Sequence, residues 1–501
     1  METAPPCRCT HTRHWLEATS DEPFIGSTMV EKVAPPSTKV IGNEAKEKFL
    51  AWADSEQGFQ VSPDVDLFHA FSEGYRGVVA TKDIPRDAVL VRIARSCCLG
   101  PETTDKSKDS WTKAMSTSAV DATKTTQGDS SKPPAPRLTR ACLTVLRLLH
   151  ERGLGESSPF HSYLSVLPQD HRLPLEWTEE EVGLLQGTSA EPLVGAGSLD
   201  SQFEAFQRVV AQHPTVWEPS VCTKAAFAKG VNWVRSRGFT VMGDPHMIPG
   251  ADMFNHDPNK QSVQIGTDGE EHFVMKTVQP VKAGEEVFSS FGHISNAQLL
   301  NSYGFVLPGN PFDTVLIPTQ LVVDTCYATF VKLEADKLGE AETKKTWEQR
   351  LAMVASNRDA DEGEQEAFVV SKYDLLPESL ADMVQILTMS NDEEVAYATI
   401  AAVSQAKMEQ YSSLLQDAKS NAGEGALGAD ARTLARMLVN EEKKVLHDLR
   451  LQLMSVILDD NVNEDRDDDE GNNDSSARGC TASGTGPDAS EEKGTKKRRK
   501  G

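Results

Sequence analysis

Two short segments of the sequence carry side chains that could do chemistry. In the first, IPGADMFNHD at 248–257, an apolar approach leads to four polar residues within six positions: Asp252, Asn255, His256 and Asp257. Burying such groups is unfavourable unless they are hydrogen-bonded or exposed in a site. A polar turn would use the same residue types, so the segment alone indicates either a binding site or a turn.

Neither segment has the pattern of a metal site or of a nucleophile. The spacing of the acidic and histidine residues in the first segment matches no zinc or iron motif, so we expect no metal. The second segment, GEEVFSSFGHISNAQLLNSYGFV at 284–306, contains Ser289 and Ser290 without an accompanying base. Packing therefore explains these serines better than nucleophilic attack does.

The elements that must position these segments differ in hydrophobic period. β-Branched runs on either side of Pro85 and of Pro280 predict short antiparallel strands, the first pair as a hairpin. Residues 138–235 contain helical stretches, and 316–458 is predicted to be helical throughout. The last helix has residues 441–444 near its polar face. Its apolar residues, three, four or seven positions apart, form one stripe: Leu434, Leu438, Val445, Leu449, Leu453 and Val456.

Composition divides the rest of the chain. Residues 101–137 are rich in Ser, Thr, Lys and Pro and hold too few large apolar side chains to fold, so we expect a disordered loop. A disordered head at 1–40 and a disordered charged tail at 459–501 are also expected. The folded part is then an α+β unit over 41–315, interrupted by the helical insert, and a helical unit over 316–458.

Charge and cysteine content narrow the class of protein. The 501 residues carry a formal net charge of −24, which argues against binding to nucleic acid or to anionic membranes, since both need basic surface. The acidic run at 459–474 within the tail contributes nine acids against Arg466, or −8 of that total. Eight cysteines without regular spacing indicate a reducing compartment. We expect neither a membrane span nor a secretory signal.

Taken together, the motifs resemble those of the SET-domain methyltransferases of the type that includes the Rubisco large-subunit lysine methyltransferase. Four segments occur in the family's order: SEGYRGVVATKDIP (72–85), VNWVRSRGF (231–239), DMFNH (252–256) and the 284–306 segment. The resemblance covers about 45–100 and 138–315 and extends more weakly into 373–390 and 440–453. It implies an α+β, β-rich SET-domain fold with a helical insert, followed by an all-α substrate-binding domain.

The resemblance also implies a pocket for S-adenosyl-L-methionine. Backbone from Glu73 through Tyr75 and Arg76 to Gly77 would lie against this cofactor, where glycine allows close approach. Arg237 would pair with the methionine carboxylate. Without the flanking motifs, Arg237 would be interpreted as a solvent-exposed charged residue on a helix.

Three further positions complete the implied cofactor pocket. Asn255 and His256 would bind the amino-acid end and the adenine through hydrogen bonds, and Asp252 would position their segment. Phe305 would pack on the adenine side.

The implied reaction is direct methyl transfer to a neutral lysine amine of a protein substrate. A water-poor channel and the positive cofactor lower the lysine pKa, and oxygens lining the channel stabilise the partly positive methyl group. Phe291 replaces the family's central tyrosine, so Tyr303 would supply the catalytic hydroxyl. The alternative that the protein is a catalytically weak or inactive SET-domain relative acting as a binding module stays open. A bulky aromatic stands before the DxxNH segment in histidine-modifying members, whereas this chain has Ala251, which favours lysine over histidine.

The termini carry two weaker patterns. The sequence CxCxHxxH at 7–14 could clip a metal, but no fold accompanies it, so we expect no site. KKRRK at 496–500 is either a nuclear import signal or a solvated tail end. We expect a monomer in the cytoplasm, the nucleus or both.

Overall fold

The computed structural model describes 41–56, 58–72, 75–101, 140–194, 199–241, 243–334, 339–356, 366–389, 393–415 and 429–467. The chain divides into two compact units after Leu453. The head and nearly all of the loop and tail predicted as disordered lie outside the described residues. Among the described helices, none is long and apolar enough to cross a membrane.

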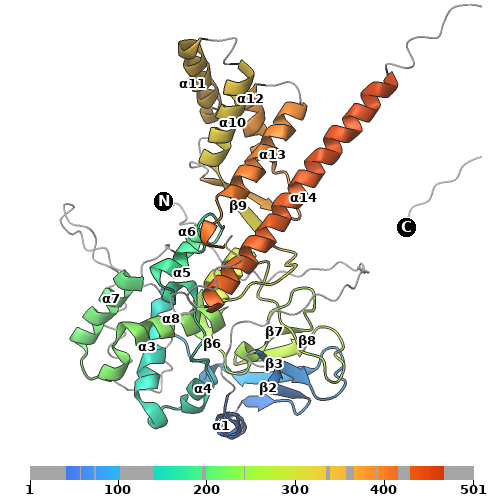
Figure 1. Ribbon diagram of the computed structural model, residues 1–501. Helices are drawn as coiled ribbons and strands as arrows, with labels where there is room; N and C mark the ends of the chain where they lie inside the picture. Colours follow the sequence, from blue (N-terminus) through green and yellow to red (C-terminus); the bar gives the residue numbers. More distant parts are fainter. Residues whose placement is uncertain are drawn as a thin grey trace, which may run out of the picture. The chain divides into compact units, whose positions relative to one another are not determined.

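The largest sheet is antiparallel, with strand order β1-β4-β8-β7. Its strands are β1 (Phe59–Val61), β4 (Val89–Ala94), β7 (Val263–Asp268) and β8 (His272–Thr277). In the β7–β8 hairpin, visible in Figure 1, Val263 lies opposite Thr277 and Asp268 opposite His272. The buried Phe273 and Met275 project from β8 into the first hydrophobic core. The strand predicted before Pro280 is therefore confirmed, but its antiparallel partners are β4 and β7 rather than the run after Pro280.

The hairpin predicted around Pro85 is wrong. Strand β3 (Tyr75–Ala80) pairs with β2 (Val65–Ser72), whereas β4 pairs with β1 and β8, so the two runs belong to different sheets. Between them Ile84 bonds to Val281 in both directions, through amide–carbonyl contacts of 2.8 and 2.9 Å. This tie holds the connection against the segment after β8, so β3 and β4 diverge although both sequences favour strands.

The segment after Pro280 runs beside the polar segment rather than forming a regular strand. It makes isolated bridges from Glu286 to Val79, from Phe288 to Gln261 and from Ser289 to His256. Through these contacts the 284–291 stretch lies next to both β3 and the polar 252–257 stretch. The two chemically suspect segments are therefore neighbours in space.

The helical insert packs against these strands. Its longer helices are α3 (Arg140–Gly153), α7 (Leu199–Gln212) and α8 (Lys224–Arg237), with the short α4 (His161–Ser165) and α5 (Glu179–Gly183) between α3 and α7. Helices α3 and α8 lie side by side in Figure 1. Thr223 caps α8 by accepting a hydrogen bond from the Ala226 amide at 3.1 Å. The helices predicted within 138–235 are thus confirmed.

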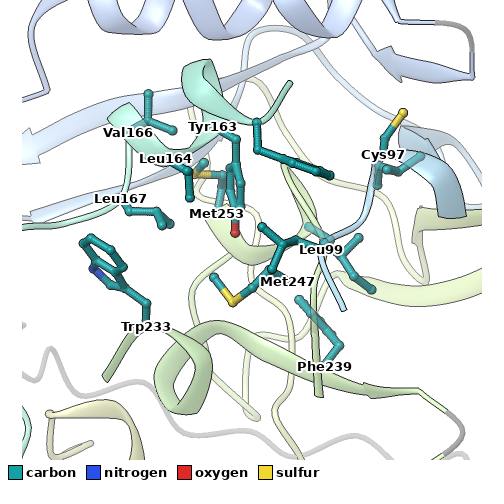
Figure 2. Packing of buried hydrophobic residues seen from close by; sticks show 14 of the residues in the cluster. Cys97, Leu99, Tyr163, Leu164, Val166, Leu167, Trp233, Phe239, Met247 and Met253 are labelled. Carbon is teal, nitrogen blue, oxygen red and sulfur yellow. The ribbon is translucent and has the colours of Figure 1, made fainter. Parts of the chain in front are cut away.

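Insert and strands share one apolar core. Figure 2 shows Tyr163 of α4 beside Met253, with Met247 and Leu99 close by and Trp233 of α8 in the same cluster. The Tyr163 and Trp233 side chains are almost completely buried. Because this core joins α4 and α8 to the polar segment, it fixes both helices relative to that segment.

The remaining described elements form a mainly helical region with its own core. They are β9 (Thr314–Pro318), α10 (Thr319–Glu334), α11 (Glu340–Ser356), β10 (Ala367–Ser371), α12 (Glu378–Thr388), α13 (Glu393–Glu409) and α14 (Ala429–Asp467). Helices α10, α12 and α13 lie against one another (Figure 1). Strand β10 departs from the all-helical prediction, because its β-branched residues pair with β9 from Ala367 opposite Pro318 to Ser371 opposite Thr314.

Helix α14 confirms one prediction and corrects two. The stripe is buried as expected at Leu434, Leu438, Val445, Leu449 and Leu453; the side chain of Val456 lies outside the description. The helix continues to Asp467, past the predicted start of the tail, as extending an existing helix is far easier than starting one. Glu441 and Glu442 are buried rather than on a polar face.

Candidate active site

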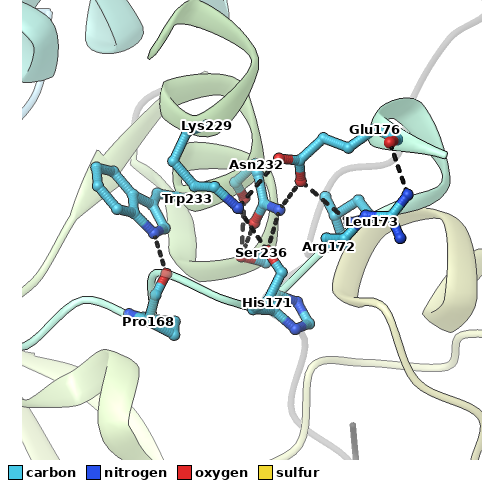
Figure 3. A network of polar contacts seen from close by, with 9 residues as sticks. All are labelled: Pro168, His171, Arg172, Leu173, Glu176, Lys229, Asn232, Trp233 and Ser236. Atoms are coloured by element: carbon cyan, nitrogen blue, oxygen red, sulfur yellow. Dashed lines mark hydrogen bonds and ion pairs between the residues drawn. The ribbon is translucent and has the colours of Figure 1, made fainter. Parts of the chain in front are cut away.

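Arg237 is held in place through the helix that it ends. The segment after α4 lies along α8, as Figure 3 shows. The indole Nε1 of Trp233 donates to the Pro168 carbonyl at 2.7 Å, and Lys229 Nζ donates to the His171 carbonyl at 2.6 Å. Asn232 Nδ2 donates to the same carbonyl at 2.9 Å. These bonds fix the last two turns of α8, so the arginine at its end has a defined position.

The Arg237 guanidinium meets the polar segment at Asp252. Its Nη1 donates to the Asp252 carbonyl at 2.9 Å and lies 3.4 Å from the carboxylate Oδ2. The Tyr163 hydroxyl donates to the same Oδ2 at 3.0 Å. The carboxylate is completely buried, and this burial raises its pKa, with Arg237 and Tyr163 opposing the rise. Asp252 therefore orders the arginine, whereas the resemblance implies that it positions the segment of Asn255 and His256.

A second arginine lies in the same cluster. Burial and the neighbouring Arg237 lower the pKa of Arg76 to about 9. Its Nη1 and Nη2 each lie 3.4 Å from the Val166 carbonyl, a weak tether. Two guanidinium groups thus converge near the single carboxylate of Asp252. Such a cluster favours an additional anionic group, because the positive charges outnumber the negative one.

Two polar atoms of this cluster have no hydrogen-bond partner in the part of the chain that the structure describes. Within the described residues, Arg237 Nε and Asp252 Oδ1 are buried and make no hydrogen bond. Buried polar atoms normally find partners, so an orphaned donor and an orphaned acceptor on two residues that contact each other indicate a place for a ligand. A zwitterionic amino-acid group, which carries both an acceptor and a donor, fits this pair.

Asn255 and His256 continue the site along the chain. Asn255 Nδ2 donates to the Arg76 carbonyl at 2.7 Å and to Glu286 Oε1 at 2.8 Å. His256 Nδ1 accepts from the Phe291 amide at 2.9 Å, so the ring proton of neutral His256 is on Nε2. Both side chains are therefore oriented by the second segment.

Three further rings cluster with the imidazole of His256. The ring of Phe291 stacks on that of His256 with centroids 4.9 Å apart and on that of Tyr303 at 4.7 Å. Phe305 lies 6.4 Å from both His256 and Tyr303. Helix α9 (Asn296–Tyr303) ends at this point because Gly304 takes a left-handed conformation, with φ of 74°. The four aromatic positions predicted from sequence are thus brought together.

A sequence comparison identifies the domain that holds this site. Residues 75–292 match the family model of the SET domain. The chain therefore carries a SET domain over these residues. The mouse protein named N-lysine methyltransferase SETD6 is 27% identical over 372 residues, which cover 70% of this chain and 71% of that protein. The ribosomal lysine N-methyltransferase set10 of Schizosaccharomyces pombe is 26% identical over 201 residues, covering 38% and 35%.

Solved SET-domain structures have the same fold. Rubisco LSMT bound to sinefungin and monomethyllysine superposes with a TM-score of 0.57 at 19% identity, over 83% of this chain and 92% of that chain. Rubisco LSMT bound to AdoMet gives 0.54 at 18% identity, with the same coverage. The predicted resemblance to this family and the predicted α+β SET fold with a helical C-terminal region are confirmed.

The first SET motif is only partly described. Glu73 lies outside the described residues. Tyr75 follows it and donates from its hydroxyl to Glu286 Oε1 at 2.6 Å; burial and Glu286 raise its pKa, so it stays a donor. At Gly77 a Cβ would overlap Glu286 Oε1 and lie 2.8 Å from Asn255 Nδ2. Glycine is therefore needed here because two side chains, those of Glu286 and Asn255, approach the backbone closely. The close approach to the cofactor that the resemblance implies stays a prediction.

Three residues of the SET-domain site escaped the sequence analysis. Tyr163 is 89 positions from its partner Asp252, so no local pattern could reveal it. Glu286 belongs to the GEE motif. Its place directly before the apolar Val287 and Phe288 is the sequence feature that could have indicated a functional carboxylate. His171 packs against Gly304, and burial, together with Arg237 and Lys229, lowers its pKa to about 4. Among the described residues no group of three potential metal ligands occurs.

Proposed function

We propose that this SET-domain protein is a protein-lysine N-methyltransferase that uses S-adenosyl-L-methionine. The observation that carries the proposal is the orphaned pair Arg237 Nε and Asp252 Oδ1, buried beside the oriented side chains of Asn255 and His256. Relatives named N-lysine methyltransferases and a structural neighbour bound to AdoMet support the same chemistry.

The residues of the site fit the cofactor. Arg237, backed by Arg76, would hold the carboxylate of its methionine part, and Asn255 and His256 would hold polar groups by hydrogen bonding. When bound, S-adenosylmethionine supplies a methyl group activated by a sulfonium. With cofactor and substrate bound, the partly buried aromatic cluster around Phe291 and Tyr303 would limit the access of water and so favour the neutral form of a lysine amine.

Tyr303 is proposed as the catalytic hydroxyl. Its ring stacks on Phe291, which has no hydroxyl of its own. The phenol oxygen is a hydrogen-bond acceptor and donor that can orient the amine for attack. Such preorganised groups act best in a water-poor site.

A second candidate rests on the same substitution. Phe291 stands where the family has its central tyrosine, so the SET domain can bind the cofactor and a protein while transferring methyl groups weakly or not at all. A protein-histidine methyltransferase is a third possibility. Ala251 argues against it, because histidine-modifying members have a bulky aromatic at this position before the polar segment. Mass spectrometry of the modified residue separates the enzyme classes.

The proposed partner is a protein that presents a lysine to a monomeric enzyme, without nucleic acid or membrane. The acidic net charge supports this part of the proposal. The basic run KKRRK at 496–500 supports a location that includes the nucleus as well as the cytoplasm.

The test is incubation of the intact protein with radiolabelled S-adenosylmethionine and a cell lysate. We expect a labelled protein band that is lost with Arg237→Ala and unchanged with Arg92→Ala, a control that removes an arginine paired with Asp268 on the sheet surface. A wild-type protein that binds no cofactor, measured by calorimetry, overturns the proposal. Binding without any labelled band supports the binding module instead.

A further inference from the structure

Asn255 is oriented by two hydrogen-bond acceptors, the backbone carbonyl of Arg76 and the carboxylate of Glu286. Neither can donate a hydrogen bond when Glu286 is ionised. Its Nδ2 donates to the Arg76 carbonyl at 2.7 Å and to the carboxylate Oε1 of Glu286 at 2.8 Å. A backbone carbonyl and a carboxylate have no proton to donate. Turning the amide over would place Asn255 Oδ1 against these two oxygens. The orientation is therefore fixed by chemistry, and Oδ1 faces away from both.

The carboxylate that imposes this orientation is itself held firmly. The Tyr75 hydroxyl donates to the same Oε1 at 2.6 Å. On either side of Glu286 the backbone is tied to β3, because Val287 N donates to the Val78 carbonyl at 2.8 Å and Glu285 O accepts from Ala80 N at 3.0 Å. Glu286 is also buried. It therefore cannot swing away from Asn255 without breaking several bonds.

The space around the pair is closed on the side of β3. A Cβ at Gly77 would overlap Glu286 Oε1 and approach Asn255 Nδ2 to 2.8 Å. The Asn255 amide and the Glu286 carboxylate therefore lie so close to the backbone of Gly77 that only glycine fits there. Nothing bulkier fits, so the SET domain reserves this volume for the Asn255–Glu286 bond.

We propose that Glu286 is a positioning residue that makes Asn255 present an acceptor to the cofactor. The inference rests on the proposed function. The group that meets Asn255 Oδ1 must then be a donor, and the ammonium of the methionine part is the donor next to the carboxylate that Arg237 and Arg76 attract. Glu286 acts through Asn255 and touches no reacting atom. The SET domain would thereby distinguish an α-amino acid from a simple carboxylate.

Two substitutions at one position test the proposal by calorimetry. Glu286→Met removes the acceptor while keeping the length of the side chain, and Glu286→Gln keeps a carbonyl acceptor for Asn255. The probes are S-adenosylmethionine and its analogue in which hydrogen replaces the amino group. We expect the wild type to prefer the amino-bearing probe, Glu286→Gln to keep most of that preference, and Glu286→Met to lose about tenfold in affinity for that probe alone.

A second variant covers the case in which Glu286→Met does not fold. Asn255→Asp replaces the donating amide with a carboxylate facing Glu286, and adding Glu286→Gln gives that carboxylate a donor in return. We expect the single variant to lose the amino-bearing probe and the double variant to regain part of the affinity. A merely structural role predicts that the affinities for both probes fall and recover together.

The outcomes separate this inference from the proposed function. A wild type that binds neither probe overturns both. A wild type that binds the amino-bearing probe, with Glu286→Met retaining the full preference or with no recovery in the double variant, overturns the positioning role alone. Equal loss in Glu286→Gln and Glu286→Met also overturns it, because the acceptor would then not be the group that matters.

Discussion

The rings of Phe291 and Tyr303 stack with their centroids 4.7 Å apart and their planes inclined by 29°. Phe291 also stacks on His256, with centroids 4.9 Å apart, so a ring without a hydroxyl contacts two that carry polar atoms. The site therefore has one phenol in this stack, that of Tyr303. Any catalytic hydroxyl in this stack must come from it.

Tyr303→Phe is expected to lower kcat for lysine methylation by about 100-fold, the usual effect of removing one preorganised hydrogen-bonding group. Because the ring stays, the Kd for S-adenosylmethionine should change by less than about twofold. Single-turnover rates and calorimetry measure the two quantities separately. An unchanged rate would show that the Tyr303 hydroxyl takes no part in transfer.

Phe291→Tyr is expected to raise the methylation rate, since it restores a hydroxyl beside Tyr303 in the ring stack. Phe312→Tyr is the matched control, because it adds the same hydroxyl to a partly exposed ring that stacks on His293. Rates are compared with one labelled protein substrate. A wild type that is silent and becomes active with Phe291→Tyr would identify the natural chain as the binding module.

Gly77→Ala is expected to weaken cofactor binding at least about tenfold, because the new Cβ displaces Glu286 and Asn255 from their bond. Overpacking should also lower the free energy of unfolding by about 1–3 kcal/mol. Gly266→Ala in β7 is the control, since its Cβ would lie 3.8 Å from Val274 in ordinary contact. Calorimetry and thermal melting check both effects; equal behaviour of the two variants would refute the explanation.

The sequence predicts the parts of the fold and of the candidate site whose contacts are local or belong to a recognised motif. The polar segment around Asn255 and the ring of Phe291 were predicted together because their motifs occur in the family's order. The partner of Asp252 was not predicted, since Tyr163 reaches it only through the packing of α4 on the strands. Turn chemistry at Pro85 correctly predicted two strands but not their partners, which depend on distant pairing.

The polar face of α14 shows why periodicity alone misplaces charges. Glu441 Oε2 accepts from the Gly309 amide at 3.0 Å, and Glu442 accepts from Ser189 N and the Tyr411 hydroxyl, each at 2.8 Å. Elements far away in sequence thus cover the face that the helix pattern leaves polar. A hydrophobic period identifies the apolar stripe but not what lies opposite to it.

Glu442→Gln tests the resulting buried carboxyl. Burial raises the pKa of Glu442 from 4.5 to about 7, so the folded protein holds a proton that the unfolded chain releases between these values. Its contribution to the free energy of unfolding is complete below pH 4.5 and is lost as the pH rises towards 7. Chemical unfolding across this range should show the loss in the wild type and a flatter profile in Glu442→Gln. Identical profiles would contradict the shift.

Titration of His171 should change the free energy of unfolding with pH in the direction opposite to that of Glu442. Its pKa falls from 6.5 to about 4 through burial and the nearby Arg237 and Lys229, so the unfolded chain takes up a proton before the folded protein does. Its contribution to the free energy of unfolding is therefore complete above pH 6.5 and declines as the pH falls to about 4.

His171→Gln removes this titration but leaves the backbone carbonyl to which Lys229 and Asn232 donate. Chemical unfolding between pH 7 and 4 should show the variant losing less stability on acidification than the wild type. In the Glu442→Gln background the difference should be easiest to measure, since the opposing titration is gone. Parallel profiles for wild type and His171→Gln would mean that the imidazole titrates alike in the folded and unfolded chains.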